Sequence, residues 1–177
     1  QPLWLEWHYR NNEGEWLPLV NERPTSAYLL NAHGDGVAHY QSRRKDERFY
    51  GLGDKAGDLQ RNGKRYEMRN LDAKGYNAVS TDPLYKHIPF TITRRDDISF
   101  GLFYDNLSSC WLDLGNEIDN YHTAYRRWQA EAGDIDYYLF TGERVLDITK
   151  AFVRLTGKTL FGPKWSLGYS GSTMHYP

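Results

Sequence analysis

The sequence is poor in several features that would point to a particular class of protein. It contains one cysteine, Cys110, so an internal disulfide and a cysteine-rich zinc site are excluded. We expect this thiol to be a small buried residue. The 22 Lys and Arg residues balance 23 Asp and Glu residues, which leaves no excess of positive charge to attract nucleic acid or an anionic membrane. The composition therefore predicts neither of these partners.

The amino-terminal residues have neither a basic region nor a long apolar run. They predict neither a signal peptide nor a membrane span. Together with the lone cysteine, they favour a cytoplasmic protein, with a secreted or periplasmic protein as the alternative.

Motifs for cofactors, metals and nucleophiles are missing too. Gly51, Gly53 and Gly57 have the wrong spacing for a dinucleotide fingerprint or a phosphate-binding loop. The six histidines include no pair four residues apart, which a helical zinc site would need. No Gly-x-Ser-x-Gly elbow is present, and Cys110 has no basic neighbour to activate it. We predict no cofactor, no metal site and no serine or cysteine nucleophile.

The sequence does contain many short alternations of apolar and polar residues, which are typical of β-strands. The predicted strands cover residues 3–10, 25–30, 37–41, 88–93, 98–104, 110–114, 123–131 and 135–141. The clearest hairpin joins residues 88–93 to 98–104, and we expect Phe90 and Ile92 to face Phe100 and Leu102 across it. Short strands at this regular spacing predict a mainly β fold, an antiparallel β-sandwich.

The pattern changes near the carboxyl end. Val145, Ile148 and Phe152 recur at helical spacing, which predicts a helix over residues 143–156 that ends at Gly157. Residues 163–169 then predict one further strand.

A central stretch, residues 49–90, is rich in glycine, aromatic and charged residues. This composition predicts an ordered loop rather than a buried strand or a long helix. Such loops bind polar ligands such as sugars, although a purely structural turn region is the alternative. Asp72 stands out because polar residues surround it from Asn70 to Asn77, and we expect them to form a hydrogen-bonding cluster.

Five sequence blocks and one junction form a pattern in a fixed order. The blocks are YGLGDK at residues 50–55, NLDAKGY at 70–76, DPLYKHIPF at 82–90, GLFYDN at 101–106 and DYYLFTG at 136–142. The junction runs from LTGK at residues 155–158 to PKWSLGY at 163–169. In this order, the blocks and the junction resemble the amino-terminal domain of glycoside hydrolase family 31.

The resemblance implies a galactose-mutarotase-like sandwich in residues 1–142. Residues 143–177 would then be a linker helix and the first strand of an incomplete catalytic (β/α)8 barrel. Members of the family are mostly retaining α-glycosidases that act at non-reducing ends. Their aspartate nucleophile and their general acid/base lie on later barrel strands, so the resemblance implies no catalytic residue in this chain and no activity of the chain alone. The implied partners are the protein's own barrel and an α-glycoside or oligosaccharide substrate.

Two substrate-binding residues follow from the resemblance alone. The loop aspartate that bonds sugar hydroxyls corresponds to Asp72, and the residue that lines the pocket after the first barrel strand corresponds to Met174. Met174 departs from the family's usual aromatic residue, which leaves the preferred sugar open. The alternative function is a free-standing carbohydrate-binding or mutarotase-like sandwich. A mutarotase would need an acid/base pair, such as His87 or His122 with a glutamate.

Overall fold

The computed structural model describes residues 3–31, 34–95, 98–117, 119 and 121–171. Within them the chain forms mainly β-strands, with one α-helix and one 3-10 helix. The elements are β1 (Glu6–Arg10), β2 (Trp16–Asn21), β3 (Tyr28–Leu30), β4 (Val37–Ser42), β5 (Arg48–Gly53), β6 (Arg65–Met68), β7 (His87–Arg94), β8 (Ser99–Tyr104), β9 (Cys110–Leu114), β10 (Tyr125–Ala130), β11 (Tyr137–Gly142), α1 (Val145–Thr156) and η1 (Lys164–Leu167).

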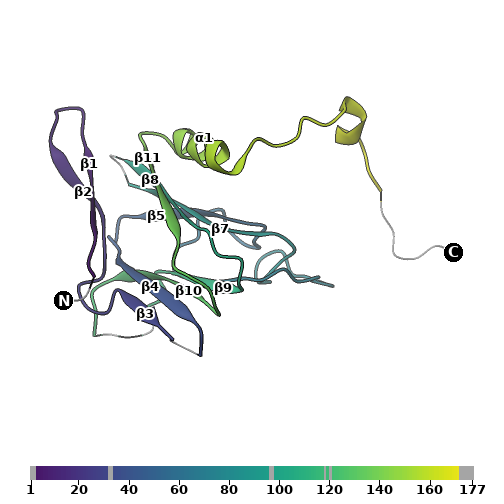
Figure 1. The fold of residues 1–177 in the computed structure, drawn as a ribbon. Helices are drawn as coiled ribbons and strands as arrows, with labels where there is room; N and C mark the ends of the chain where they lie inside the picture. The colour runs from purple at the N-terminus through teal and green to yellow at the C-terminus, as the bar shows by residue number, and fades with distance from the viewer. Residues whose placement is uncertain (1–2, 32–33, 96–97, 118, 120, 172–177) are drawn as a thin grey trace.

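The strands form three antiparallel sheets, and the alternation predicts every strand except β2, β5 and β6. β1 and β2 make a separate hairpin, and the two larger sheets have the orders β3-β4-β10-β9-β6 and β11-β8-β7-β5. In Figure 1 the four-stranded sheet lies between helix α1 and the five-stranded sheet. The predicted sandwich is therefore confirmed, and helix α1 adds a third layer.

The main core lies between the two larger sheets. Its most buried side chains include Phe49, Phe100, Leu102 and Trp128, each at most 1% exposed. Cys110 belongs to this core, as expected, and burial raises the pKa of its thiol to about 12. The thiol is therefore an apolar packing group at neutral pH.

A second apolar cluster lies on the outer face of the four-stranded sheet. Phe90 and Ile92 pack there against Ile148 of helix α1. The predicted hairpin of β7 and β8 is present, but the expected facing is wrong, because Phe100 and Leu102 point into the main core instead. Since both faces of this sheet are covered, apolar residues occur on both, and alternation cannot tell the faces apart.

The central stretch is more regular than its composition predicts. Residues 49–90 contain β5 and β6, so the prediction of one continuous loop is wrong for these two segments. Phe49 and Met68, from these strands, are fully buried. Gly51 and Gly53 take positive φ values of 107° and 77°, where β5 shifts register against β7. Here the glycines mark an irregular strand rather than the absence of one.

The end of the described chain also differs from the prediction. Helix α1 matches the expected helix and ends at Gly157, whose N–H donates to the Val153 carbonyl. The strand predicted over residues 163–169 is not formed: residues 164–167 make the 3-10 helix η1 instead. A barrel strand needs hydrogen-bonded neighbours, and no described strand pairs with this segment. Figure 1 shows the segment running away from the sandwich.

Candidate functional site

The segment that carries Asp72 is the loop from residue 69 to residue 86, which joins β6 to β7. The base of the loop is fixed by Asp82. One carboxylate oxygen of Asp82 accepts from the backbone N–H of Glu67 at 2.6 Å, and the other accepts from the Lys55 ammonium at 2.6 Å. The return of the loop is thereby tied to the strand from which it leaves.

The distal part of the loop is fixed by its own turns. The Asn77 side-chain oxygen accepts from the N–H groups of Val79 and Ser80 at 2.9 and 3.2 Å. The Gly57 N–H donates to the Ala78 carbonyl, and a side chain at Gly57 would lie 2.9 Å from the Val79 carbonyl oxygen. The turn after β5 is thus pressed directly against the loop.

Asp72 itself lies at the exposed surface of this loop. Its neighbour Ala73 is buried, and the Tyr85 hydroxyl donates to the Ala73 carbonyl at 3.3 Å. Desolvation raises the pKa of the Tyr85 hydroxyl, and the nearby Asp72 carboxylate adds to this shift. Asp72 is therefore open to solvent, next to a backbone segment that Tyr85 holds, and its carboxylate lone pairs remain available for a hydroxyl-rich ligand.

The expected hydrogen-bonding cluster is not formed among the described contacts, because no side-chain hydrogen bond joins Asp72 to Asn70, Lys74, Tyr76 or Asn77. Asn77 does not join it, because its side chain caps the turn of residues 77–80. Tyr85 lies near Asp72 instead, although it is thirteen positions further along the chain than Asp72. Met174, the second expected substrate-binding residue, lies outside the described residues.

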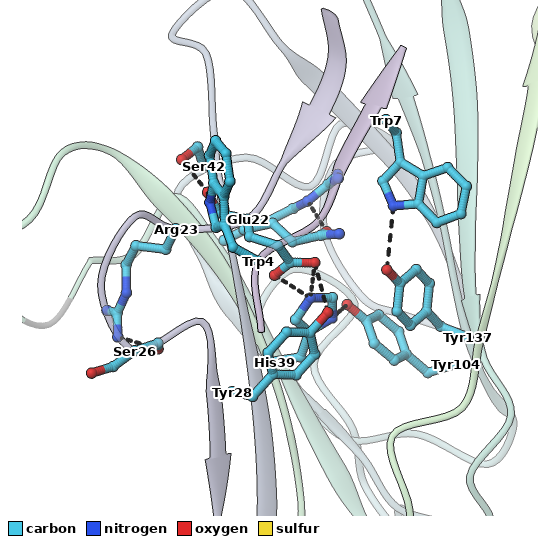
Figure 2. A network of polar contacts seen from close by, with 12 residues as sticks. Trp4, Trp7, Glu22, Arg23, Ser26, Tyr28, His39, Ser42, Tyr104 and Tyr137 are labelled. Carbon is cyan, nitrogen blue, oxygen red and sulfur yellow. Dashed lines mark hydrogen bonds and ion pairs between the residues drawn. The ribbon is translucent and has the colours of Figure 1, made fainter. Parts of the chain in front are cut away.

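A separate polar cluster lies between the sheets and is centred on His39 (Figure 2). His39 Nε2 is 2.8 Å from a Glu22 carboxylate oxygen, and its Nδ1 is 2.9 Å from the Tyr104 hydroxyl. The Tyr28 hydroxyl donates to Glu22 at 2.8 Å. The side chains of His39 and Glu22 are both 0% exposed. A sugar cannot reach this histidine–glutamate pair.

The histidines considered for a mutarotase do not pair with a glutamate among the described contacts. His122 Nδ1 is 2.8 Å from Asp119, and this bond is the largest cause that lowers the pKa of Asp119. Burial, and then the nearby Lys55 cation, lower the pKa of His87. Neither histidine therefore has a glutamate among its described hydrogen-bond partners.

The sequence alone did not identify the residues that fix the loop of residues 69–86, or the partner of His39 in the buried polar cluster. Lys55 and Asp82 are 27 positions apart and meet only through the fold. His39 did carry a signal, because it alternates with Val37 and Gln41 on the inward side of β4. Nothing in the sequence around Glu22 marks it as its partner.

The described residues lack a metal-binding cluster and a membrane-spanning helix. No group of three or more His, Cys, Asp and Glu side chains there is arranged to bind a metal ion. None of the helices in that part of the chain combines the length and apolarity needed to span a bilayer.

The sequence has clear relatives among characterised enzymes. α-Glucosidase 2 of Bacillus thermoamyloliquefaciens is 36% identical over 140 residues, which are 79% of this chain and 17% of that protein. The α-glucosidase of Saccharolobus solfataricus is 33% identical over 143 residues, 81% of this chain and 20% of that protein. The chain thus spans about a fifth of the length of these relatives.

A solved structure is similar to this chain as well. The glycoside hydrolase family 31 dextranase of Flavobacterium johnsoniae, in complex with glucose, aligns with a TM-score of 0.77 and 31% identity. The alignment covers 93% of this chain and 19% of the dextranase chain. Residues 2–113 match the family described as the glycosyl hydrolase 31 N-terminal galactose mutarotase-like domain. With a family match over more than half of its length and relatives above 30% identity, the chain belongs to this family of glycosyl hydrolase 31 N-terminal domains.

Proposed function

We propose that this chain is the non-catalytic amino-terminal domain of a retaining α-glycosidase that acts on non-reducing-end α-linked sugars. The observation that carries this proposal is the 36% identity to an α-glucosidase over 79% of the chain. Because the chain spans about a fifth of such relatives, the remainder of a longer protein would supply the catalytic barrel.

The contribution of the chain to substrate binding would be the loop of residues 69–86. Asp72 is exposed on it, so its carboxylate is free to accept hydrogen bonds from sugar hydroxyls. Tyr76, on the same loop, is 56% exposed and offers an aromatic face to the C–H patches of a sugar ring. A loop whose ends are held in place and whose aspartate is exposed is suited to binding a ligand.

The segment after helix α1 supports a partner within the same protein. Phe161, Trp165 and Tyr169 are 97%, 82% and 99% exposed. Exposed aromatic side chains at this density are typical of a surface that packs against another domain. We propose that this segment, with the predicted boundary between residues 142 and 143, leads into the catalytic barrel.

The first test replaces Asp72 with alanine in the full-length enzyme. A charge-assisted hydrogen bond to a sugar hydroxyl is worth about 1.5–3 kcal/mol, so we expect kcat/KM to fall by about 10- to 100-fold. The measurement uses aryl α-glucoside, α-xyloside and α-galactoside substrates, because the preferred sugar is open.

Asp35→Ala serves as the matched control, since Asp35 is an exposed aspartate in a distant turn. Its kcat/KM should equal that of the unchanged enzyme. If Asp72→Ala behaves like Asp35→Ala on every substrate, Asp72 has no role in binding.

A further test uses the 177-residue chain alone. We expect it to release no nitrophenol from aryl α-glycosides, because the proposed catalytic aspartates lie elsewhere in the enzyme. Turnover that disappears when an acidic residue of this chain is replaced would show that the chain has its own active site.

A further inference from the structure

The free edge of strand β6 has an unusual pair of partners. β6 is the last strand of the five-stranded sheet and pairs only with β9 on one side. On the other side an edge strand presents unpaired N–H and C=O groups, which need acceptors and donors. At Glu67 both groups are satisfied by side chains: the N–H donates to Asp82, and the C=O accepts from the Lys55 ammonium.

The two side chains also bind each other. Lys55 Nζ is 2.6 Å from Asp82 Oδ1, and the side chains of Lys55 and Asp82 are 1% and 23% exposed. A cation that is so deeply buried needs a charged partner, because losing its hydration is otherwise costly. Lys55 and Asp82 therefore form one unit, in which the carboxylate takes the place of a strand carbonyl and the ammonium takes the place of a strand N–H.

We propose that this Lys55–Asp82 pair is a side-chain substitute for a neighbouring strand, which closes the loop of residues 69–81 at its base and positions Asp72. The inference rests on the proposed function of Asp72, and it names Lys55 and Asp82 as positioning residues. Neither Lys55 nor Asp82 would contact the sugar.

The geometry explains why closure at this point matters for Asp72. Asp72 lies five residues after Glu67, and Asp82 returns the chain to the same residue. Next to Asp82 the chain is pinned again, because Pro83 is buried and the Asp54 N–H donates to the Lys86 carbonyl at 2.8 Å. Releasing Asp82 would free the base of the loop while β7 stays in its sheet, so the Asp72 carboxylate would sample many positions instead of one.

The first experiment measures amide hydrogen exchange in the full-length enzyme. Lys55→Met and Asp82→Ala should speed exchange at residues 69–81 by about 10- to 100-fold, the effect of losing a charge-assisted bond. Exchange in β7 and β8 should stay unchanged, because their ladders are intact. Asp82→Asn, which keeps the side-chain shape, provides the same comparison if Asp82→Ala does not fold.

The matched control is Asp46→Asn. Asp46 forms an ion pair with Arg44, but both side chains are at least 50% exposed and far from β6 in the sequence. This substitution should leave exchange at residues 69–81 unchanged.

A charge swap separates the strand-substitute role from that of an ordinary ion pair. In the double variant Lys55→Asp with Asp82→Lys, opposite charges still face each other. The new lysine, however, would meet the Glu67 N–H and the new aspartate would meet its C=O, so donor faces donor and acceptor faces acceptor. We expect no rescue of slow exchange by the swap, whereas an ordinary ion pair would be rescued.

The kcat/KM of the same variants then tests whether the pair positions Asp72. We expect Lys55→Met and Asp82→Asn to lower kcat/KM, but by less than Asp72→Ala. The proposal is overturned if exchange at residues 69–81 stays slow in Lys55→Met and Asp82→Ala, or if the charge swap restores slow exchange. It is also overturned if exchange becomes faster but kcat/KM keeps its original value, in an enzyme that Asp72→Ala impairs. If Asp72→Ala itself has no effect, the proposed function fails, and the exchange rates still decide whether the pair closes the loop.

Discussion

Replacing Glu22 with alanine is expected to lower the free energy of unfolding by about 3–5 kcal/mol, the range for removing one partner of a buried pair. The variant would leave the His39 ring and the Tyr28 hydroxyl without their carboxylate partner in a site closed to water. For a domain of this size the melting temperature should fall by about 6–20 °C. The measurement is thermal and urea unfolding of the 177-residue chain.

Two further variants make this result specific. Glu6→Ala, on the exposed strand β1, removes an acidic side chain with no buried partner and should change stability by less than about 0.5 kcal/mol. Glu22→Gln keeps one oxygen acceptor and should cost about 1–2 kcal/mol. A loss for Glu22→Ala no larger than that for Glu6→Ala would mean that the His39 cluster contributes nothing to stability.

The cluster could not be predicted from the sequence because its members lie far apart in the chain. Its members come from the segment after β2, from β4 and from β8, and their contacts join positions up to 65 residues apart. Alternation along β4 places His39 inside, but it does not say which acid will meet it. Burial is a property of one strand, whereas the bond to Glu22 depends on the bridge between Glu22 and Gln41, and the bond to Tyr104 depends on how the two sheets are packed.

The strands themselves were predictable where one face is polar or the ends are marked by turns. β9 and the β7–β8 hairpin have such marks, and both were expected. β2, β5 and β6 were not expected; in β5, Gly51 and Gly53 resemble loop residues although they pair with β7. The 3-10 helix η1 replaced an expected strand for the opposite reason: its sequence suits a strand, but no described strand lies beside it.

The candidate site was predictable only in part. Asp72 stands out in the sequence by its polar neighbours, its sugar-binding role is implied by the resemblance to the family, and the structure places it at the exposed surface of the loop. The sequence pattern does not predict the Lys55–Asp82 pair, because both side chains bond to the backbone of Glu67. Side-chain to backbone contacts over such distances leave no periodic signal in a sequence.

Replacing Phe152 with alanine is expected to cost about 3 kcal/mol and to release helix α1 from the sandwich. The Phe152 ring stacks on Phe90 at 4.2 Å and meets Phe103 edge-on at 5.2 Å. Without it, the apolar outer face of the four-stranded sheet becomes accessible to water. We expect a melting temperature lower by about 6–12 °C and faster amide exchange throughout Val145–Thr156.

Leu155→Ala is the control on the same helix, because Leu155 is 46% exposed and should cost less than about 1 kcal/mol. The comparison also tests the predicted boundary between residues 142 and 143. A large loss for Phe152→Ala alone would show that helix α1 stabilises the sandwich, so that the folded unit extends to Gly157. Equal, small losses for both variants would show that the helix is a separable linker. Ile148 of helix α1 favours the first result, because it is 0% exposed and packs against Phe90 and Ile92 of the sheet, and a separable linker has no reason to bury an isoleucine completely.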